Sequence, residues 1–378
     1  MIAFNDSKAG YDTWLQAQLG SDFVAADLEQ KNGLMRDSAF VFLRGTYWRW
    51  AEMILEICPD LASAPQVLAV GDIHLENYGT WRDADGRLVW GVNDFDEAAP
   101  MPYAIDLVRL AASALLGGDE RKNALETITK ALLKGYAKGL AAPSPVVLDR
   151  DWPELRADVI VDEDRRDKFW KKIDARINEP APPRFQTALA AAMPEQGVAF
   201  DTARRVAGTG SLGRPRWIGV ADWRGGGVVR EAKVLVTSGW SLAHGVAAAP
   251  IRAFEIATGR FRAPDPWYSV TDNIVVRRLS PNNRKIEADK RGAFLLEPSM
   301  HEAMGFELAN IHLGAAEAGA AIQADLRARK PGWLAANVAA AVDAVRADYK
   351  QFRKRGSKKQ SPESDAAAGE VARASETN

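Results

Sequence analysis

A block of short β-rich runs, enclosed on both sides by segments with helical periodicity, restricts the fold of this 378-residue sequence more than any other feature. Glycines separate the β-rich runs, which lie at 204–206, 216–222, 228–236 and 274–279. Apolar side chains at helical spacing precede the block, at 37–57, 103–116, 119–140 and 152–189, and such spacing returns from 298 to about 352. The pattern predicts an α+β protein in which the helices are segregated from a small antiparallel sheet.

Within the first helical part, a short strand and a hairpin are expected. Pro65 introduces an apolar run at 67–70, and Asp85-Gly86 is a hairpin turn signal between 78–81 and 87–92. We therefore predict four regions: a mainly helical lobe at 1–200, a β-rich lobe at 201–290, helices that return to the first lobe at 291–354, and a disordered Ser-, Ala- and charge-rich tail at 355–378.

Composition excludes several functional classes. Hydrophobic residues make up 47% and charged residues 26% of the chain, as in ordinary globular proteins. Forty-nine basic and 50 acidic side chains give a net charge of −1, so we expect neither a nucleic-acid nor a membrane partner. The single Cys58 excludes a disulfide framework, and the first residues lack the basic and apolar regions of a signal peptide. A cytoplasmic protein is expected.

Two acidic motifs flank the predicted hairpin. Gly71-Asp72-Ile73-His74-Leu75-Glu76-Asn77 precedes it, and Asn93-Asp94-Phe95-Asp96-Glu97 follows it. A carboxylate at the end of a strand can take a proton from a hydroxyl, while further carboxylate and amide oxygens suit a hard cation such as Mg²⁺. The structural alternative is that Asp72 and Asn77 form turns and that Asp94 and Asp96 cap the next helix.

The spacing of these motifs leads to a family resemblance. Asp72 and Asn77 are five positions apart, as are Asp and Asn in the kinase catalytic loop, and 94–96 stands where kinases have Asp-Phe-Gly. The segment resembles the aminoglycoside-phosphotransferase branch of the protein-kinase-like superfamily, whose motifs read Gly-Asp-x-His-x-x-Asn and Asp-Phe-x-Asp/Glu. It looks even closer to a bacterial family catalogued as domain of unknown function 2252, through 42–45, 71–79, 93–98 and 106–110.

The resemblance implies roles for individual residues. Asp72 would be the catalytic base, Asn77 and Asp94 would bind the metal, Asp96 would be an auxiliary carboxylate there, and Asp106 would be a buried group that braces the loop.

Four further side chains of this region are expected to take no direct part in catalysis. His74 is interpreted as a local packing and hydrogen-bonding residue rather than an acid–base group. Arg44 is expected to brace a carboxylate rather than to meet a phosphate. Glu76 and Glu97 are expected to be solvated.

A glycine-rich run opens the β-rich block, with Gly208, Thr209, Gly210, Ser211 and Gly213 as candidate nucleotide-binding residues. A dinucleotide-binding turn requires a helix directly afterwards and an acidic residue about twenty positions on. Here a strand follows and Lys233 occupies that position, which favours the kinase type of loop and phosphate-binding lysine. Pro215 and Ala232 depart from the kinase pattern, and a glycine-rich hairpin with a surface lysine is the alternative.

Lys233 needs a carboxylate partner in this interpretation. Glu255, on a predicted helix at 251–258, is either that partner or a solvated helix residue.

The candidate residues form two constellations, the first made by the acidic motifs at 71–77 and 93–97 and the second by the glycine-rich run and Lys233. Their order is the reverse of that found in kinases, because the glycine-rich run follows the predicted catalytic loop. We therefore predict a two-lobed protein-kinase-like fold with permuted order, the helical catalytic-loop lobe first and the small antiparallel β-lobe after it, with ATP in the cleft between them.

The expected function is ATP- and Mg²⁺-dependent phosphoryl transfer to a hydroxyl of an unidentified, small-molecule acceptor. Two alternatives stay open: a nucleotide-binding regulatory protein without phosphotransfer, and nucleotidyl transfer to a protein with ATP bound in the inverted direction.

Overall fold

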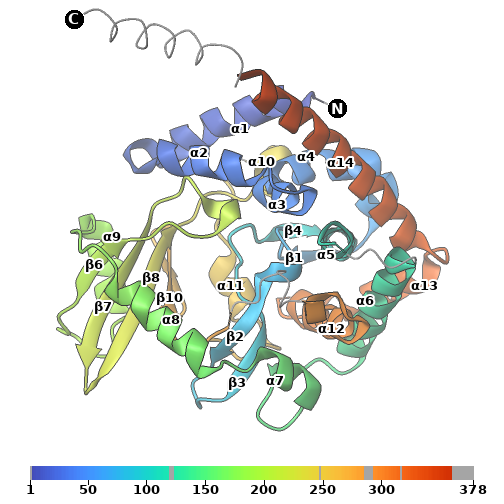
Figure 1. Cartoon of the computed structure of the whole chain (residues 1–378). Helices are drawn as coiled ribbons and strands as arrows, with labels where there is room; N and C mark the ends of the chain where they lie inside the picture. Colours follow the sequence, from blue (N-terminus) through green and yellow to red (C-terminus); the bar gives the residue numbers. More distant parts are fainter. Residues whose placement is uncertain (1, 119–122, 247, 285–292, 316, 360–378) are drawn as a thin grey trace, which may run out of the picture.

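The structure is a computed structural model that describes residues 2–118, 123–246, 248–284, 293–315 and 317–359, with only the backbone described at 293 and 355–359. It is a mixed α+β protein, as the sequence pattern predicts, and it has several antiparallel sheets. Helices occupy one side of the molecule and a five-stranded sheet the other, with shorter strands between them (Figure 1). In the described part of the chain, no helix is long and apolar enough to cross a lipid bilayer.

Segments from both ends of the chain form the helical part. Its helices are α1 (Phe4–Leu19), α2 (Ala25–Leu34), α3 (Ala39–Gly45), α4 (Tyr47–Ile57), α5 (Tyr103–Leu116), α6 (Ala124–Ala141), α12 (Pro298–His312), α13 (Gly319–Ala328) and α14 (Trp333–Lys359). A Cβ on Gly135 of α6 would lie 1.8 Å from the backbone oxygen of Glu302, and one on Gly305 of α12 would lie 2.2 Å from that of Leu132. Glycine is thus required where α6 and α12 meet backbone to backbone. The C-terminal helices belong to this part of the molecule, since α12 packs against α6 and α14 packs against α5.

Two small sheets lie inside the helical part and carry the first constellation. Strand β1 (Gln66–Ala69) pairs with β4 (Ala99–Pro102), and β2 (Tyr78–Arg82), β3 (Leu88–Val92) and β5 (Val146–Val147) form a three-stranded antiparallel sheet. Gly86 turns the hairpin at φ +77°, and Tyr78 is opposite Val92. The residues that flank the hairpin therefore meet, and the Asn93 N–H donates to the Asn77 oxygen at 3.1 Å.

The five-stranded antiparallel sheet has the order β6-β7-β8-β10-β9. Its strands are β6 (Asp201–Arg204), β7 (Arg216–Trp223), β8 (Gly226–Val234), β9 (Ser269–Thr271) and β10 (Ile274–Leu279). Helix α9 (Pro183–Ala191) packs on one face, where Phe185 contacts Trp217. Helix α8 (Glu163–Asp174) covers part of the other face, where Ile173 packs against Ile218 and Val229. Glu231 and Lys233 continue along the same side of β8 as Val229, since every second residue of a strand shares a face.

Several expected boundaries differ from the structure. The helix expected at 37–57 is broken at Thr46, whose backbone leaves the helical region at φ −126° and ψ 41°. Helices α8 and α9 fall within the predicted helical lobe at 1–200 yet pack on the sheet, because their apolar faces match its two sides. Helix α14 runs on to Lys359, past the expected start of the tail, and residues 360–378 of that tail lie outside the described residues.

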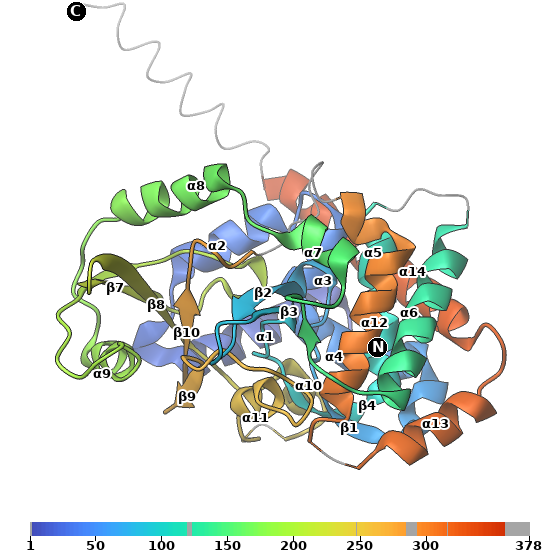
Figure 2. The ribbon, with the colours of Figure 1, turned by 90° about the horizontal axis from the view of Figure 1, so that it is seen from below.

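The remaining connections are helical. Helix α7 (Pro153–Val159) leads into α8, and α10 (Gly239–Ala243) and α11 (Ala253–Ala257) join β8 to β9. Helix α10 packs against α4 of the helical part, so the connection after β8 crosses back to the helices. Figure 2 shows the sheet at one side and the α5, α6 and α12 group at the other, with β2 and β3 between them.

Candidate functional site

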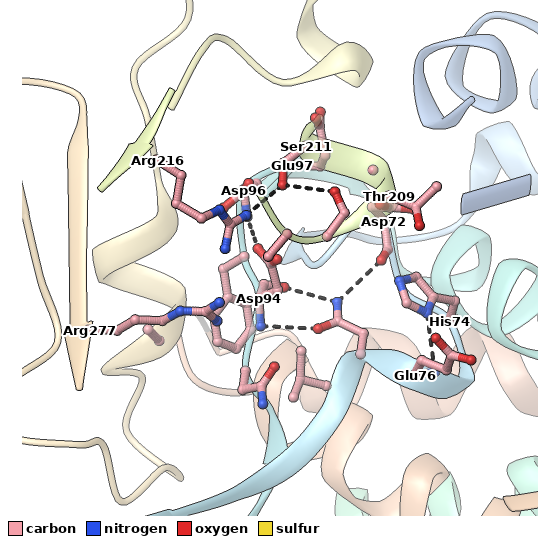
Figure 3. Close-up of a pocket in the computed structure, with 18 of the residues that line it drawn as sticks. Asp72, His74, Glu76, Asp94, Asp96, Glu97, Thr209, Ser211, Arg216 and Arg277 are labelled. Carbon is pink, nitrogen blue, oxygen red and sulfur yellow. Dashed lines mark hydrogen bonds between the residues drawn. The ribbon is translucent and has the colours of Figure 1, made fainter. Parts of the chain in front are cut away.

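A cavity of about 350 Å³ lies between the five-stranded sheet and the helical part. Its walls bring together both predicted constellations: Asp72, Asn77, Asp94 and Asp96 from the first, and residues 208–211 from the second. Figure 3 shows the aspartates on one side and the loop with Thr209 and Ser211 on the other. Segments more than a hundred positions apart in the chain thus share one pocket.

Asn77 ties the two acidic motifs together. Its Nδ2 donates to the backbone oxygens of Asp72 at 3.2 Å and of Asp94 at 2.9 Å, and its Oδ1 accepts from the Asp94 N–H at 3.0 Å. Gly71 supports the turn before Asp72 with φ +77°, where a Cβ would lie 2.5 Å from the hydroxyl of Tyr47. The first motif is therefore held against the second by an amide side chain whose polar atoms are both engaged.

Asp106, near the start of α5, braces the same turn from below. Its fully buried carboxylate accepts from the backbone N–H groups of Val70 at 2.8 Å and Gly71 at 3.0 Å. The Nε2 of His312 lies 3.2 Å from the same carboxylate, and the Nδ1 of His312 is 2.8 Å from the hydroxyl of Tyr136. A series of polar side chains from α6 and α12 thus reaches, through Asp106, the end of β1.

The Asp72 carboxylate pairs with Arg109, whose guanidinium is fully buried. Burial raises the pKa of Asp72, and the charge and hydrogen bond of Arg109 oppose that rise. The guanidinium of Arg109 lies over the rings of Tyr47 at 5.0 Å and Trp50 at 5.2 Å, and these contacts fix the plane of the guanidinium group. Nothing in the sequence marks Arg109 as the partner of Asp72, because an arginine inside an apolar helix gives no separate signal.

The neighbouring side chains of the loop are also engaged locally. His74 Nδ1 accepts from the Glu76 N–H at 3.2 Å and caps the turn at 75–77. Arg44 pairs with Glu76 at 2.5 Å, so it meets a carboxylate. Glu76 and Glu97 were expected to be solvated, and this is wrong: both are buried, and Glu97 accepts from Arg214 at 2.8 Å and from the Gly239 N–H at 2.6 Å.

Asp94 and Asp96 share one lysine. The Nζ of Lys233, which is 2% exposed, lies 2.6 Å from Asp96 Oδ1 and 3.3 Å from Asp94 Oδ1. Burial and the charge of Asp94 raise the pKa of Asp96 to about 7. Burial acts in the same direction on Asp94, but Lys233, the hydrogen bond with Asp96 and nearby arginines outweigh it and hold its pKa below the usual range.

The pair of aspartates suits a metal that receives further ligands from elsewhere. No group of three or more His, Cys, Asp or Glu in the described ranges is placed to hold a metal ion. Mg²⁺ is commonly bound through one or two carboxylates, with water and nucleotide phosphates completing its shell. Asp94 and Asp96 fit that mode, with Asn77 beside them.

The glycine-rich run forms a short 3₁₀ turn at Thr209–Ser211 between β6 and β7. A Cβ on Gly210 would lie 3.3 Å from Asp72 Oδ2 and 3.2 Å from the Arg44 oxygen, so glycine allows the loop to approach the first acidic motif closely. Lys31 of α2 anchors the loop through a hydrogen bond of 2.9 Å from its Nζ to the Gly210 oxygen. Burial lowers the pKa of Lys31 to about 8. No sequence motif marked Lys31.

Glu255 does not partner Lys233. It lies on α11 and pairs with Arg252 through hydrogen bonds of 2.5 and 2.6 Å at the surface. Of the two alternatives for Glu255, the structure shows the solvated helix residue and not the partner of Lys233, since the lysine points to Asp94 and Asp96. The i,i+3 spacing of Arg252 and Glu255 on one helix face explains their local pairing.

Comparison with known proteins agrees with the resemblance to a bacterial family. Residues 24–197 match the model of the family described as "Uncharacterized protein conserved in bacteria (DUF2252)". The match includes Asp72, Asn77, Asp94, Asp96 and Asp106 and ends just before β6. No curated protein and no solved structure matches the chain.

Proposed function

We propose that this protein is an ATP- and Mg²⁺-dependent phosphotransferase with a protein-kinase-like, two-lobed fold in permuted order. The observation that carries the proposal is that Asp72 and Asp94 line one cavity, while Lys233, 139 positions from Asp94 in the chain, pairs with Asp94 from the five-stranded sheet. Phosphoryl transfer uses a base, a metal-binding carboxylate and a nearby lysine, which are the kinds of group that meet here.

The position of the second constellation supports the kinase-like arrangement. The glycine-rich run joins the first two strands of the five-stranded sheet, and Lys233 is on the third strand in chain order. In protein kinases a glycine-rich loop covers the nucleotide phosphates and the lysine is likewise on the third strand. The cleft between the sheet and the helices is then the place for the nucleotide.

In the proposed metal site, two residues would be ligands of the metal and two others would hold those ligands in place. Asp94 and Asp96 would hold Mg²⁺, with the phosphates as its remaining ligands. When bound, the metal neutralises charge on the phosphates. Lys233 orients both carboxylates and Asn77 fixes the loop that carries them.

Asp72 would receive the proton of the acceptor hydroxyl. In the transfer, the bond between the γ-phosphorus and the bridging oxygen breaks, a bond from the acceptor oxygen to that phosphorus forms, and the hydroxyl proton passes to Asp72. Arg109 favours the ionised form of Asp72 that this step needs, against the effect of burial. ADP and the phosphorylated acceptor are the products.

The test is single-turnover transfer from ATP labelled at the γ or the α phosphorus, with a panel of sugars, polyols and nucleosides as acceptors. We expect Mg²⁺-dependent transfer of the γ label, reduced about 100-fold or more by Asp72→Asn with nearly unchanged ATP affinity. Asp85→Asn, in the exposed hairpin turn, is the control. Transfer of the α label to protein indicates nucleotidyl transfer instead, and ATP binding without any transfer indicates a regulatory protein.

A further inference from the structure

Three arginines meet one buried carboxylate on the sheet side of the cavity. Glu231 of β8 is 1% exposed and accepts from Arg216 Nη1 at 2.8 Å and from Arg277 Nε at 2.8 Å, and it also pairs with Arg205. The three arginines line the cavity, whereas Glu231 lies behind them. Figure 3 shows Arg216 and Arg277 extending toward Asp94 and Asp96.

The cross-strand register explains why these side chains converge. Arg277 of β10 is directly opposite Glu231, and Arg216 of β7 is opposite Lys233, two positions further along β8. Arg205 follows β6 and donates its backbone N–H to Arg216 at 2.9 Å. Strands β7, β8 and β10 and the end of β6 thus present one charged patch at the end of the sheet that faces the cavity.

The patch carries more positive than negative charge. One carboxylate pairs with three guanidinium groups, so the net charge of these four side chains is 3 − 1 = +2. Although burial alone would raise the pKa of Glu231, the three arginines hold it well below the usual range, so this carboxylate stays ionised. Asp94, Asp96 and Lys233 together carry at most one net negative charge, so a positive surplus faces the cavity even before a metal is bound.

We propose that Arg205, Arg216 and Arg277 form the polyphosphate subsite of this cavity, with Glu231 as the residue that positions them. The proposal rests on the proposed function for the identity of the ligand as a nucleotide. Lys233 is already engaged by Asp94 and Asp96, so the main phosphate contacts pass to the arginines. A guanidinium donates through a planar fork that matches two phosphate oxygens, and pairing with Glu231 leaves other N–H groups of each fork for the ligand.

The subsite is linked to the glycine-rich loop. Arg216 Nη2 donates to the Ser211 hydroxyl at 2.7 Å and lies 3.3 Å from the position of a Cβ on Gly208. A phosphate chain bound by Arg216 therefore lies directly beside this loop.

The experiment titrates inorganic tripolyphosphate, and separately ATP and adenosine, into the full-length protein without Mg²⁺. The variants are Arg205→Gln and Arg277→Gln, whose side chains are 26% and 27% exposed, so the fold tolerates their loss better than that of buried Arg216. Arg252→Gln is the control, because Arg252 is an arginine of similar exposure that pairs with Glu255 away from the cavity. Arg277→Lys keeps the charge and removes the fork.

We expect both glutamine variants to bind tripolyphosphate and ATP at least tenfold more weakly than the wild type does. Arg277→Lys is expected to weaken this binding less, and the affinity for adenosine is expected to stay unchanged in all variants. Equal tripolyphosphate affinity in the wild type, Arg205→Gln and Arg277→Gln overturns the subsite, even where Mg²⁺·ATP binds and is turned over. Arginine-dependent binding of tripolyphosphate without binding of ATP supports the subsite and contradicts the proposed function. Absence of tripolyphosphate binding to the wild type overturns the subsite directly.

Discussion

The Nζ of Lys233 lies 2.6 Å from Oδ1 of Asp96, and this ion pair joins the third strand of the five-stranded sheet to the loop after the β2–β3 hairpin. The side chains of Lys233 and Asp96 are only 3% and 12% exposed. The pair therefore connects the two parts of the molecule across the cavity, and it also places the carboxylates that we propose as metal ligands.

Replacing Lys233 with Met is expected to destabilise the protein by about 3 kcal/mol at pH 8, because it leaves the largely enclosed Asp96 carboxylate and its neighbour Asp94 without their cation. At pH 5.5 the loss is smaller, since Asp96, with a pKa of about 7, is then protonated and needs no cation. Urea unfolding at both pH values measures the difference.

The matched control for Lys233→Met is Lys8→Met, which removes a lysine from an i,i+4 pair with Asp12 near the surface. Its loss is expected to stay below about 1 kcal/mol at either pH. Equal destabilisation of Lys233→Met at pH 5.5 and pH 8 contradicts the assignment of the raised pKa to Asp96.

Binding of Mg²⁺ in the presence of ATP is expected to strengthen as the pH rises from 6 to 8. Asp96 has a pKa of about 7, raised by burial and by the charge of Asp94, so below that value a proton competes with the metal. Each pH unit below 7 is expected to weaken binding by up to about tenfold, since one proton is displaced. Calorimetric titration across this range gives the slope.

The variant Asp96→Asn separates the protein's contribution to the pH dependence of Mg²⁺ binding from the nucleotide's contribution. The variant is expected to bind Mg²⁺ more weakly but with a shallower pH dependence, because only the titration of the nucleotide remains. The same slope in wild type and Asp96→Asn means that Asp96 does not hold the competing proton.

Asp106→Ala is expected to cost about 2–5 kcal/mol of folding free energy, since the buried N–H groups of Val70 and Gly71 lose their acceptor. Because these groups form the turn before Asp72, turnover of the folded variant is expected to fall as well. Denaturant unfolding and activity measured on the same sample test both effects. Asp83→Ala, which also removes a buried carboxylate but at the hairpin turn, is expected to destabilise the protein without changing turnover per folded molecule.

Much of this arrangement could be predicted from local sequence. Proline, glycine and apolar periodicity marked β1, the hairpin, α5 and β10 almost to the residue, because each of these elements has a local signal. The family resemblance, rather than a local signal, implies the bracing role of Asp106, and its carboxylate accepts hydrogen bonds from the turn before Asp72. Asp72, Asn77 and Asp94 stood out because the spacing of small polar residues beside a strand is itself informative.

Other features depend on long-range packing that one sequence does not reveal. The sequence leaves Glu255 open between a partner of Lys233 and a solvated helix residue, because a carboxylate on a short predicted helix carries no sign of which lysine it meets. The structure shows the second. Lys31, Arg214 and Glu231 were missed because their partners come from distant segments. Arg277 has no local signal of a role, and only the cross-strand register places it opposite Glu231 on the cavity wall.

The central claim, that Asp94 and Asp96 hold the metal of a nucleotide site, is tested most directly by the melting temperature with ATP, with and without Mg²⁺, for wild type and Asp94→Asn. A ligand at about 100 times its dissociation constant adds about 2.7 kcal/mol to stability, which a melting curve detects readily. Asp60→Asn, an exposed carboxylate outside the cavity, is the control. We predict a Mg²⁺-dependent rise with ATP in wild type and Asp60→Asn that Asp94→Asn loses. No rise in wild type with ATP and Mg²⁺, or an equal rise in Asp94→Asn, would contradict the claim.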